Sequence, residues 1–203
     1  MVEEQIARRG VRDPRVLAAV GKVPRHLFVP AGLEARAYDD KPLGIGREQT
    51  ISQPYMVALM SEALELRGGE RVLEVGTGSG YQTAVLLELG ADVLSVERVP
   101  ELSAKARAAL DAAGYGRRGR LTVGDGSSGV GTEAPFDRII VTAGAPAVPP
   151  SLVEQLGDGG VMVIPVGGED EQDLLRLRRE DGRVTREKMC GCVFVKLLGA
   201  EGW

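Results

Sequence analysis

Short apolar runs alternate with segments of helical periodicity through the middle and the second half of the chain. The apolar runs predict strands at 71–75, 92–96, 120–123, 137–142 and 160–165. The segments between them carry apolar residues at helical spacing and predict helices at 80–89, 101–113 and 149–156. Strands that alternate with helices in this way are typical of a doubly wound, mostly parallel α/β sheet with helices on both faces.

The two ends of the chain follow other patterns. Residues 1–66 predict helices and loops, with Asp13 as the N-cap of one helix and Ser52 as the N-cap of another, at 53–66. After residue 168, two strands flank Asp181–Gly182, which is a strong turn signal, so an antiparallel C-terminal edge is expected. We therefore expect a single domain over 1–203, in which an N-terminal helical extension (1–66) precedes the sheet core (67–203).

Composition and charge narrow the class of protein. The chain has 203 residues, 43% of them hydrophobic, and contains no apolar run long enough for a membrane span. Its N-terminus is charged and lacks the apolar core of a signal peptide, so a cytoplasmic location is expected. The net charge of −4, without a lysine/arginine tract, argues against nucleic acid as a partner. A monomer is expected.

The inventory of metal ligands and nucleophiles is small. Cys190, Cys192 and His26 are the only cysteines and the only histidine, which does not readily supply a four-ligand zinc site. The two thiols are two residues apart on a predicted strand, so they share a face and are expected to pack rather than react. His26 is expected to be an interfacial or surface residue, and no metal is expected.

A glycine-rich turn after the first predicted strand points to a cofactor. The run from Glu74 to Gly80 reads E-x-G-x-G-x-G and leads directly into a helix. A dinucleotide-binding turn would require a small residue at position 81, where this chain has Tyr81. The run instead resembles the first motif of S-adenosylmethionine-dependent methyltransferases.

Two further carboxylates follow strands whose carboxyl ends should meet at one edge of the sheet. Glu97 ends the second strand of the core and can accept hydrogen bonds from both ribose hydroxyls of a nucleoside. Asp125, flanked by Gly124 and Gly126 after the third strand, can accept from an exocyclic adenine amine. Glu74 is a carboxylate beside a site for a cationic ligand, where it would fix the glycine turn or bind the methionine ammonium through water.

The segment 49–56, QTISQPYM, lies outside the sheet core. Local reasoning favours Ser52 as a helix N-cap, although the free amides of that helix end are also suited to hold a carboxylate. Together with the later motif VLEVGTGSGYQTAVL, this segment resembles the signature pair of protein-L-isoaspartate (D-aspartate) O-methyltransferases. Further similar segments follow in order along the chain: GDG at 124–126, APFDRIIVTAGAP at 134–146, GGVMVIPVGG at 159–168 and VFVKLLG at 193–199.

The resemblance implies a fold, a reaction and a set of site residues. It implies a Rossmann-like methyltransferase fold that transfers a methyl group from S-adenosyl-L-methionine to the free carboxylate of L-isoaspartyl residues, and of D-aspartyl residues, in damaged proteins and peptides. The product of the cofactor would be S-adenosyl-L-homocysteine. The implied residues are Ser52 as the active-site serine; Thr50, Ile51, Ser52 and Gln53 between substrate and cofactor; Gly76, Gly78, Ser79 and Gly80 at the methionine part; Glu97 at the ribose; and Asp125 and Gly126 at the adenine. Two contacts complete the set, a closing loop at 142–146 and a C-terminal contact from Leu198.

Some positions depart from the family pattern, and other functions stay open. Arg47–Glu48 precedes QTISQP where a small or histidine-containing pair is usual, and Lys196 stands where proline is frequent. A methyltransferase for a small molecule or RNA would keep the cofactor residues but would have no use for TISQPYM. Tyr81 speaks against an NAD-dependent oxidoreductase, and the presence of Ser52 speaks against a catalytically silent cofactor-binding protein.

Overall fold

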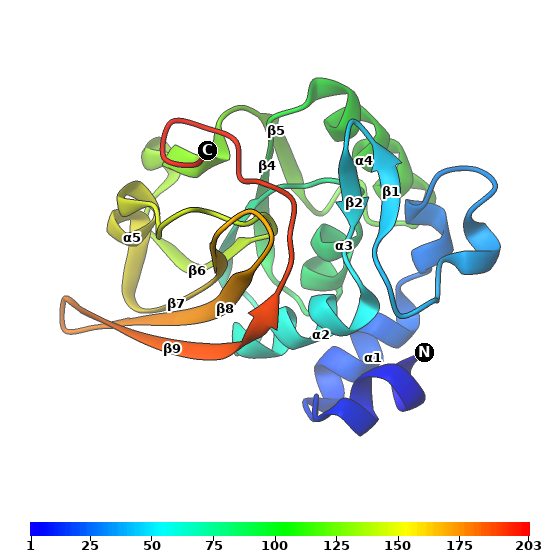
Figure 1. The fold of residues 1–203 in the computed structure, drawn as a ribbon, viewed down its shortest axis with the longest axis horizontal. Coiled ribbons are helices and arrows are strands. Elements are labelled where there is room, and N and C mark those ends of the chain that lie inside the picture. Colours follow the sequence, from blue (N-terminus) through cyan, green and yellow to red (C-terminus); the bar gives the residue numbers. More distant parts are fainter.

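The computed structural model describes all residues, 1–203, and its centre is a sheet of seven strands in the order β5-β4-β3-β6-β7-β8-β9 (Figure 1). Five strands run parallel: β3 (Arg71–Val75), β4 (Asp92–Glu97), β5 (Arg120–Val123), β6 (Phe136–Val141) and β7 (Leu156–Gly167). Two strands, β8 (Gln172–Glu180) and β9 (Arg183–Cys192), extend this sheet in antiparallel pairing. The predicted fold class, a mostly parallel sheet with an antiparallel C-terminal edge, is confirmed.

Successive residues of the central strands belong to two different hydrophobic cores. Val72 and Ile140 pack into a large cluster with helices α1 (Pro14–Lys22), α2 (Pro54–Ala63), α3 (Tyr81–Glu88) and α4 (Pro100–Ala112). Leu73 and Ile139 pack into a second cluster with α5 (Pro150–Gln155). Because side chains alternate across a strand, neighbouring apolar residues in a strand such as RVLEV fill both faces of a buried parallel sheet.

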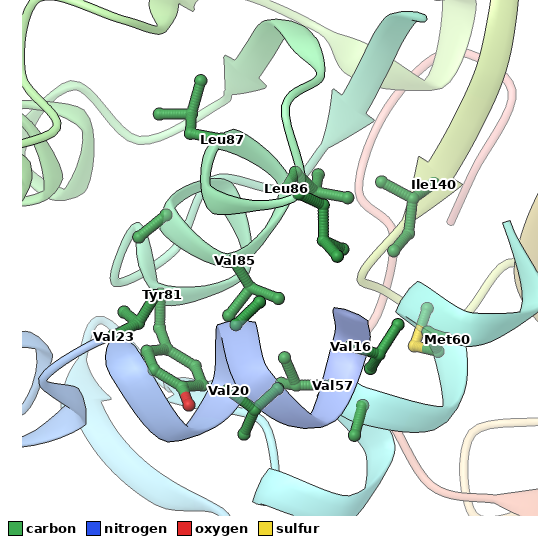
Figure 2. Packing of buried hydrophobic residues seen from close by; sticks show 14 of the residues in the cluster. Val16, Val20, Val23, Val57, Met60, Tyr81, Val85, Leu86, Leu87 and Ile140 are labelled. Atoms are coloured by element: carbon green, nitrogen blue, oxygen red, sulfur yellow. The ribbon is translucent and has the colours of Figure 1, made fainter. Parts of the chain in front are cut away.

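The N-terminal helix α1 packs tightly against the sheet core. Figure 2 shows Val16 and Val20 of α1 close to Val57 of α2 and Val85 of α3. The predicted start of α1 is confirmed, since the Asp13 side chain accepts a hydrogen bond from the Arg15 amide at 2.8 Å and Pro14 is the first helical residue. Burial of four aliphatic side chains of this size stabilises the contact by roughly 6 kcal/mol.

A hairpin stands where the sequence suggested only loop. Strands β1 (Leu43–Gly46) and β2 (Gln49–Ile51) pair antiparallel, and Arg47 and Glu48 form the turn with φ of 54° and 59°. In β1 the buried leucine and isoleucine alternate with exposed glycines. The alternation typical of a strand is therefore present, but it extends over only four residues. The predicted N-cap of α2 was wrong by one residue: Gln53 occupies that position and no side chain caps the helix.

Short helical turns complete the N-terminal region; they span Val2–Ile6, Ala7–Arg9, Arg25–Phe28 and Glu34–Arg36. At the other end, the Asp181–Gly182 turn between β8 and β9 is confirmed, with φ of 50° and 73°. Beyond β9 the chain leaves the sheet edge and returns over the carboxyl ends of the strands, where its C-terminus lies (Figure 1). None of the helices has the length and apolar character needed to span a bilayer.

The two cysteines lie packed and the single histidine lies at the surface, as the sequence predicts. Cys190 and Cys192 are free, half-buried and packed against the larger core, and burial raises the pKa of the Cys192 thiol to about 12. His26 is exposed, and its Nδ1 lies 2.7 Å from the hydroxyl oxygen of Tyr38.

Candidate active site

A cavity that is partly open to solvent lies beyond the carboxyl ends of the central parallel strands. Its walls come from the β1–β2 hairpin, the turn after β3, the end of β4 and the C-terminal segment. Clefts at the strand ends of an open α/β sheet are the usual ligand sites of such folds. The lining includes Thr50, Ile51, Ser52, Gly76, Thr77, Gly78, Ser79, Tyr81, Glu97, Gly126, Thr142, Ala143 and Leu198.

The turn after β3 is built so that its backbone faces the cavity. Gly76 has φ of 96°, and a Cβ at this position would lie 2.4 Å from the Thr142 Oγ1 atom. The Thr142 hydroxyl donates to the Gly76 carbonyl at 2.6 Å, and the Gly76 amide donates to the Val96 carbonyl at 2.9 Å. Only glycine fits here, and the turn is fixed from both neighbouring strands before any ligand arrives.

Glu97 ties the end of β4 to the glycine turn. One carboxylate oxygen accepts the Gly78 amide at 2.8 Å, and the other accepts the Val99 amide at 2.9 Å. The side chain is 6% exposed and lines the cavity. Each carboxylate oxygen has a further lone pair, so Glu97 can still accept two hydroxyl groups of a ligand.

Glu74 lies behind the turn rather than in the cavity wall. The side chain is fully buried, and one of its oxygens accepts the Thr83 hydroxyl at 2.5 Å while the other has no hydrogen-bond partner. Desolvation raises the pKa of Glu74 to about 7, against the opposing effect of the Thr83 hydroxyl. Its place behind the turn favours the first of its two expected roles, which is to fix the glycine turn, and it does so through Thr83 of the helix that follows.

The third carboxylate, Asp125, is engaged by the protein itself. One of its oxygens accepts the amide and the hydroxyl of Ser127, at 2.9 and 2.7 Å, and the other accepts the Ala200 amide at 2.7 Å. Gly126 lines the cavity, whereas Asp125 does not. Backbone and hydroxyl donors around it keep the pKa of Asp125 low against the effect of burial, so it remains an anionic acceptor beside the cavity.

The opposite wall of the cavity carries the residues of the segment TISQ. Thr50, Ile51 and Ser52 line it, and Ser52 makes no cap bond to α2, so its hydroxyl is available to a ligand. Gln53 lies outside this cavity and donates to the Asp40 carbonyl at 3.1 Å. Thr50, Ser52 and Gln53 also line an adjoining pocket, which reaches Cys190 and Phe194.

The C-terminal segment and the loop at 142–146 form one unit over the site. The Gly144 amide donates to the Val195 carbonyl at 2.7 Å, and the Leu197 amide donates to the Gly144 carbonyl at 2.8 Å. Buried Gln172 fixes the start of the segment by accepting the Phe194 amide at 2.7 Å. The loop expected to close over the reacting centre is therefore held by residues some fifty positions further along the chain.

Several lining residues were not identified from the sequence. Thr77 and Val99 sit inside or next to motifs already recognised, so their positions could have been included. The contribution of residues 195–197 had no local signal, because it depends on where the chain returns after β9. Gly80 was predicted to contact the cofactor, but it does not line the cavity. It is the N-cap of α3, with φ of 86°.

The cavity suits a cofactor that joins a nucleoside to an amino acid. The glycine turn presents backbone without Cβ atoms, Glu97 presents free lone pairs, and a Cβ on Gly126 would lie 2.6 Å from Val75, so that wall also needs glycine. Open backbone at the glycine turn and free acceptor positions on Glu97 suit the amino-acid and nucleoside parts of such a cofactor.

Comparison with known proteins gives a consistent result. The model of the family described as protein-L-isoaspartate(D-aspartate) O-methyltransferase matches residues 1–202. A protein-L-isoaspartate O-methyltransferase of Geotalea uraniireducens is 56% identical over 100% of this chain and 94% of its own length. One of Methanoculleus marisnigri is 54% identical over 100% of this chain and 92% of its own length.

Solved structures agree with these relatives. A Plasmodium falciparum protein assigned as a protein-L-isoaspartate O-methyltransferase, in complex with S-adenosyl-L-homocysteine, superposes with a TM-score of 0.85 at 25% identity, covering 97% of this chain and 96% of that one. A second structure named protein-L-isoaspartate O-methyltransferase gives a TM-score of 0.87 at 29% identity, covering 100% of this chain and 67% of that one.

Proposed function

The chain belongs to the protein-L-isoaspartate(D-aspartate) O-methyltransferase family, and we propose on that premise that it methylates the free carboxylate of L-isoaspartyl residues in damaged proteins and peptides. The methyl donor is S-adenosyl-L-methionine. The observation that carries the proposal is the joint lining of one cavity by the glycine turn with Glu97 on one wall and by Ser52 on the other. A methyl donor and a carboxylate acceptor can meet between these walls.

The reaction requires little of the protein beyond the positioning of the methyl donor and the acceptor carboxylate. When bound, S-adenosyl-L-methionine supplies a methyl group on a positively charged sulfur. A carboxyl group with a pKa near 4 is already ionised at pH 7, so no general base is needed. Holding the two reactants in line and excluding water can supply an effective molarity of about 10⁵ M or more.

The residue roles are part of the proposal. Gly76, Gly78 and Ser79 hold the methionine part, and Gly80 sets the start of the following helix. Glu97 accepts the ribose hydroxyls, while Gly126 and the neighbouring Asp125 form the adenine wall. The support for these roles is the placement of the backbone amides and the free acceptor positions described above.

On the acceptor wall, Thr50, Ile51 and Ser52 contact the transfer region, and the Ser52 hydroxyl donates to the acceptor carboxylate. This bond must stay moderate, since a carboxylate held too strongly would be a weaker nucleophile. Gln53 contributes from the adjoining pocket, and Leu198 contributes from the C-terminal segment. We also propose that 1–203 is a single methyltransferase domain, in which 1–66 forms the acceptor side.

Methyl transfer from labelled cofactor to a matched pair of peptides tests the activity. One peptide carries an L-isoaspartyl residue and the other carries a normal aspartyl residue at the same position. Base-labile label on the isoaspartyl peptide alone is expected. Cofactor binding without label on either peptide would contradict the acceptor assignment, and the absence of cofactor binding would contradict the role of the glycine turn.

Other expectations from the sequence stay predictions. These are a cytoplasmic location, a monomeric state, the absence of a nucleic-acid partner and the use of D-aspartyl residues as further acceptors. Each has a direct measurement, such as sedimentation for the monomer and a D-aspartyl peptide in the transfer assay.

A further inference from the structure

A buried guanidinium lies directly behind the acceptor wall of the cavity. Arg25 is 0% exposed, and its Nε and Nη2 atoms donate to the carbonyl oxygens of Ala37 and Ser52 at 2.6 and 2.7 Å. The guanidinium carbon lies 4.7 Å from the centre of the Tyr81 ring. Ser52 and Tyr81 both line the cavity, so the charge of Arg25 is one layer of residues away from the ligand space.

The two carbonyl groups that Arg25 binds flank the segment 38–51. This segment carries the β1–β2 hairpin, so Arg25 joins both ends of the element that bears Thr50 and Ile51. A neutral donor could satisfy either carbonyl. The full charge of a buried arginine is therefore not explained by these two hydrogen bonds, because burying an ion without a counterion is costly.

The charge is not compensated within the protein. Arg25 makes no ion pair, and its Nη1 atom is buried without a hydrogen-bond partner. The carboxylate with an electrostatic influence on it is Asp40, which is already paired with Arg9 at 2.6 Å. Arg25 therefore has no carboxylate partner of its own. Burial lowers the pKa of Arg25 to about 10, so the group remains protonated at neutral pH.

We propose that Arg25 is a positioning residue that sets the affinity of the acceptor site for a carboxylate, acting through its charge from behind Ser52. This inference rests on the proposed function, because it takes a carboxylate as the group that enters the cavity. The negative charge of the bound acceptor supplies the compensation that the protein lacks. Across a wall of low dielectric constant such an attraction is much stronger than in water.

The change of charge during the reaction predicts a kinetic effect that a merely structural role of Arg25 would not produce. As the new O–CH₃ bond forms and the S–CH₃ bond breaks, the carboxylate becomes a neutral ester and the sulfonium becomes a neutral thioether. Because Arg25 lies directly behind Ser52 on the acceptor wall, its charge acts on the carboxylate more than on the sulfonium, and it stabilises the bound acceptor more than the transition state or the ester product. Its loss should raise KM for the peptide without a matching fall in kcat.

The test compares Arg25→Gln, which keeps a donor but loses the charge, with Arg25→Lys, which keeps the charge. For Arg25→Gln we expect KM for an isoaspartyl peptide to rise by about tenfold or more, with kcat and the Kd for S-adenosyl-L-homocysteine within about threefold of the wild type. Arg25→Lys should restore most of the peptide affinity. Equal KM values for the two variants, or a fall in kcat that matches the rise in KM, would overturn the proposal.

An uncharged probe makes the comparison specific. An isoasparaginyl peptide has an amide in place of the acceptor carboxylate and can be measured as an inhibitor. Its inhibition constant should change by less than about threefold in Arg25→Gln, because an amide carries no charge to attract. An equal loss of both peptides would assign Arg25 to packing alone.

A variant at the half-buried Asp40, with the opposite expected sign, covers the case in which Arg25→Gln does not fold. Asp40→Asn removes the negative charge that Arg9 and Arg25 feel, so KM for the isoaspartyl peptide should fall by about threefold. An unchanged or raised KM contradicts the proposal. Failure of the proposed function is distinct from this, since it would show as absence of methyl transfer by the wild-type protein.

Discussion

The two walls of the cavity are built in different ways. On the cofactor wall, Glu97 and Gly76 are fixed by hydrogen bonds to neighbouring strands of the same sheet. On the acceptor wall, Ser52 and Thr50 lie at the end of a two-stranded hairpin held by the buried Arg25 and by the exposed pair Arg47–Glu101. A wall fixed within one sheet suits a cofactor that never changes. A wall on a separate hairpin, anchored to the core by Leu43, Ile45 and Ile51, suits peptides of varied sequence.

If this contrast is right, changes on the cofactor wall should act on cofactor affinity, and changes on the acceptor wall should act on turnover or on the peptide. Variants at four positions test the separation, and their expected effects decrease from Glu97 to Glu74, then to Ser52 and finally to Arg47.

Replacing Glu97 should have the largest effect. Glu97→Ala removes the acceptor of the Gly78 and Val99 amides as well as the expected ribose contact. Loss of two charge-assisted hydrogen bonds should weaken binding of S-adenosyl-L-homocysteine by about 4 kcal/mol, or about a thousandfold, measured by titration calorimetry. Glu97→Gln, which keeps the size and one acceptor oxygen, should lose less. An unchanged Kd in Glu97→Ala would remove Glu97 from the cofactor wall.

Glu74 tests whether the buried carboxylate behind the glycine turn lowers the free energy of unfolding at neutral pH. Its pKa is raised from 4.5 to about 7, so the folded protein binds this proton more tightly than the unfolded chain does. The stabilisation is complete below pH 4.5 and is lost as the pH rises through about 7.

Glu74→Gln cannot titrate, so its free energy of unfolding relative to the wild type should rise by about 3 kcal/mol between pH 4.5 and pH 8. Denaturant titrations across this pH range measure it. The control is Glu3→Gln at an exposed position, which should follow the wild type. Parallel pH profiles for Glu74→Gln and the wild type would mean that the buried carboxyl does not titrate in this range.

Ser52 tests the acceptor wall. Ser52→Ala should lower kcat on an isoaspartyl peptide by roughly tenfold, because one hydrogen bond that orients the carboxylate is lost. The Kd for S-adenosyl-L-homocysteine should stay unchanged, since the cofactor wall is intact. Ser128→Ala, outside the cavity, serves as the matched control. If Ser52→Ala weakens cofactor binding as much as it lowers kcat, the two walls do not act separately.

The smallest effect is expected at the tip of the hairpin. The Arg47 guanidinium donates to the Glu101 carboxylate at 2.8 Å through Nε, and this pair connects the hairpin to α4 on the protein surface. Arg47→Ala should change the peptide KM by about twofold at low ionic strength and not at all at high ionic strength, because exposed ion pairs are weak and screened. A large effect that persists in salt would show that the turn shape, rather than the ion pair, controls the wall.

The sequence alone determined most of the cofactor wall. Strands such as RVLEV and DVLSVE are recognised by their clustered apolar residues, and the glycines that follow the first of them need conformations that few other residues adopt. Because parallel strands end at one edge of the sheet, the turn at 76–80 and Glu97 could be placed together from the order of the elements. The resemblance added Ser52, whose role local reasoning had assigned to a helix cap.

Tertiary structure decided how the acceptor wall is held and how the cavity is closed. The β1–β2 hairpin is too short for a clear periodic signal, and the C-terminal lining at 195–197 depends on where the chain travels after β9. Arg25 is the clearest case. In sequence it is one charged residue in VPRHLFVP, and only the packing of the N-terminal turn against Ser52 and Tyr81 buries it without a counterion. Burial and charge balance are sums over residues distant in the chain, so no local pattern can contain them.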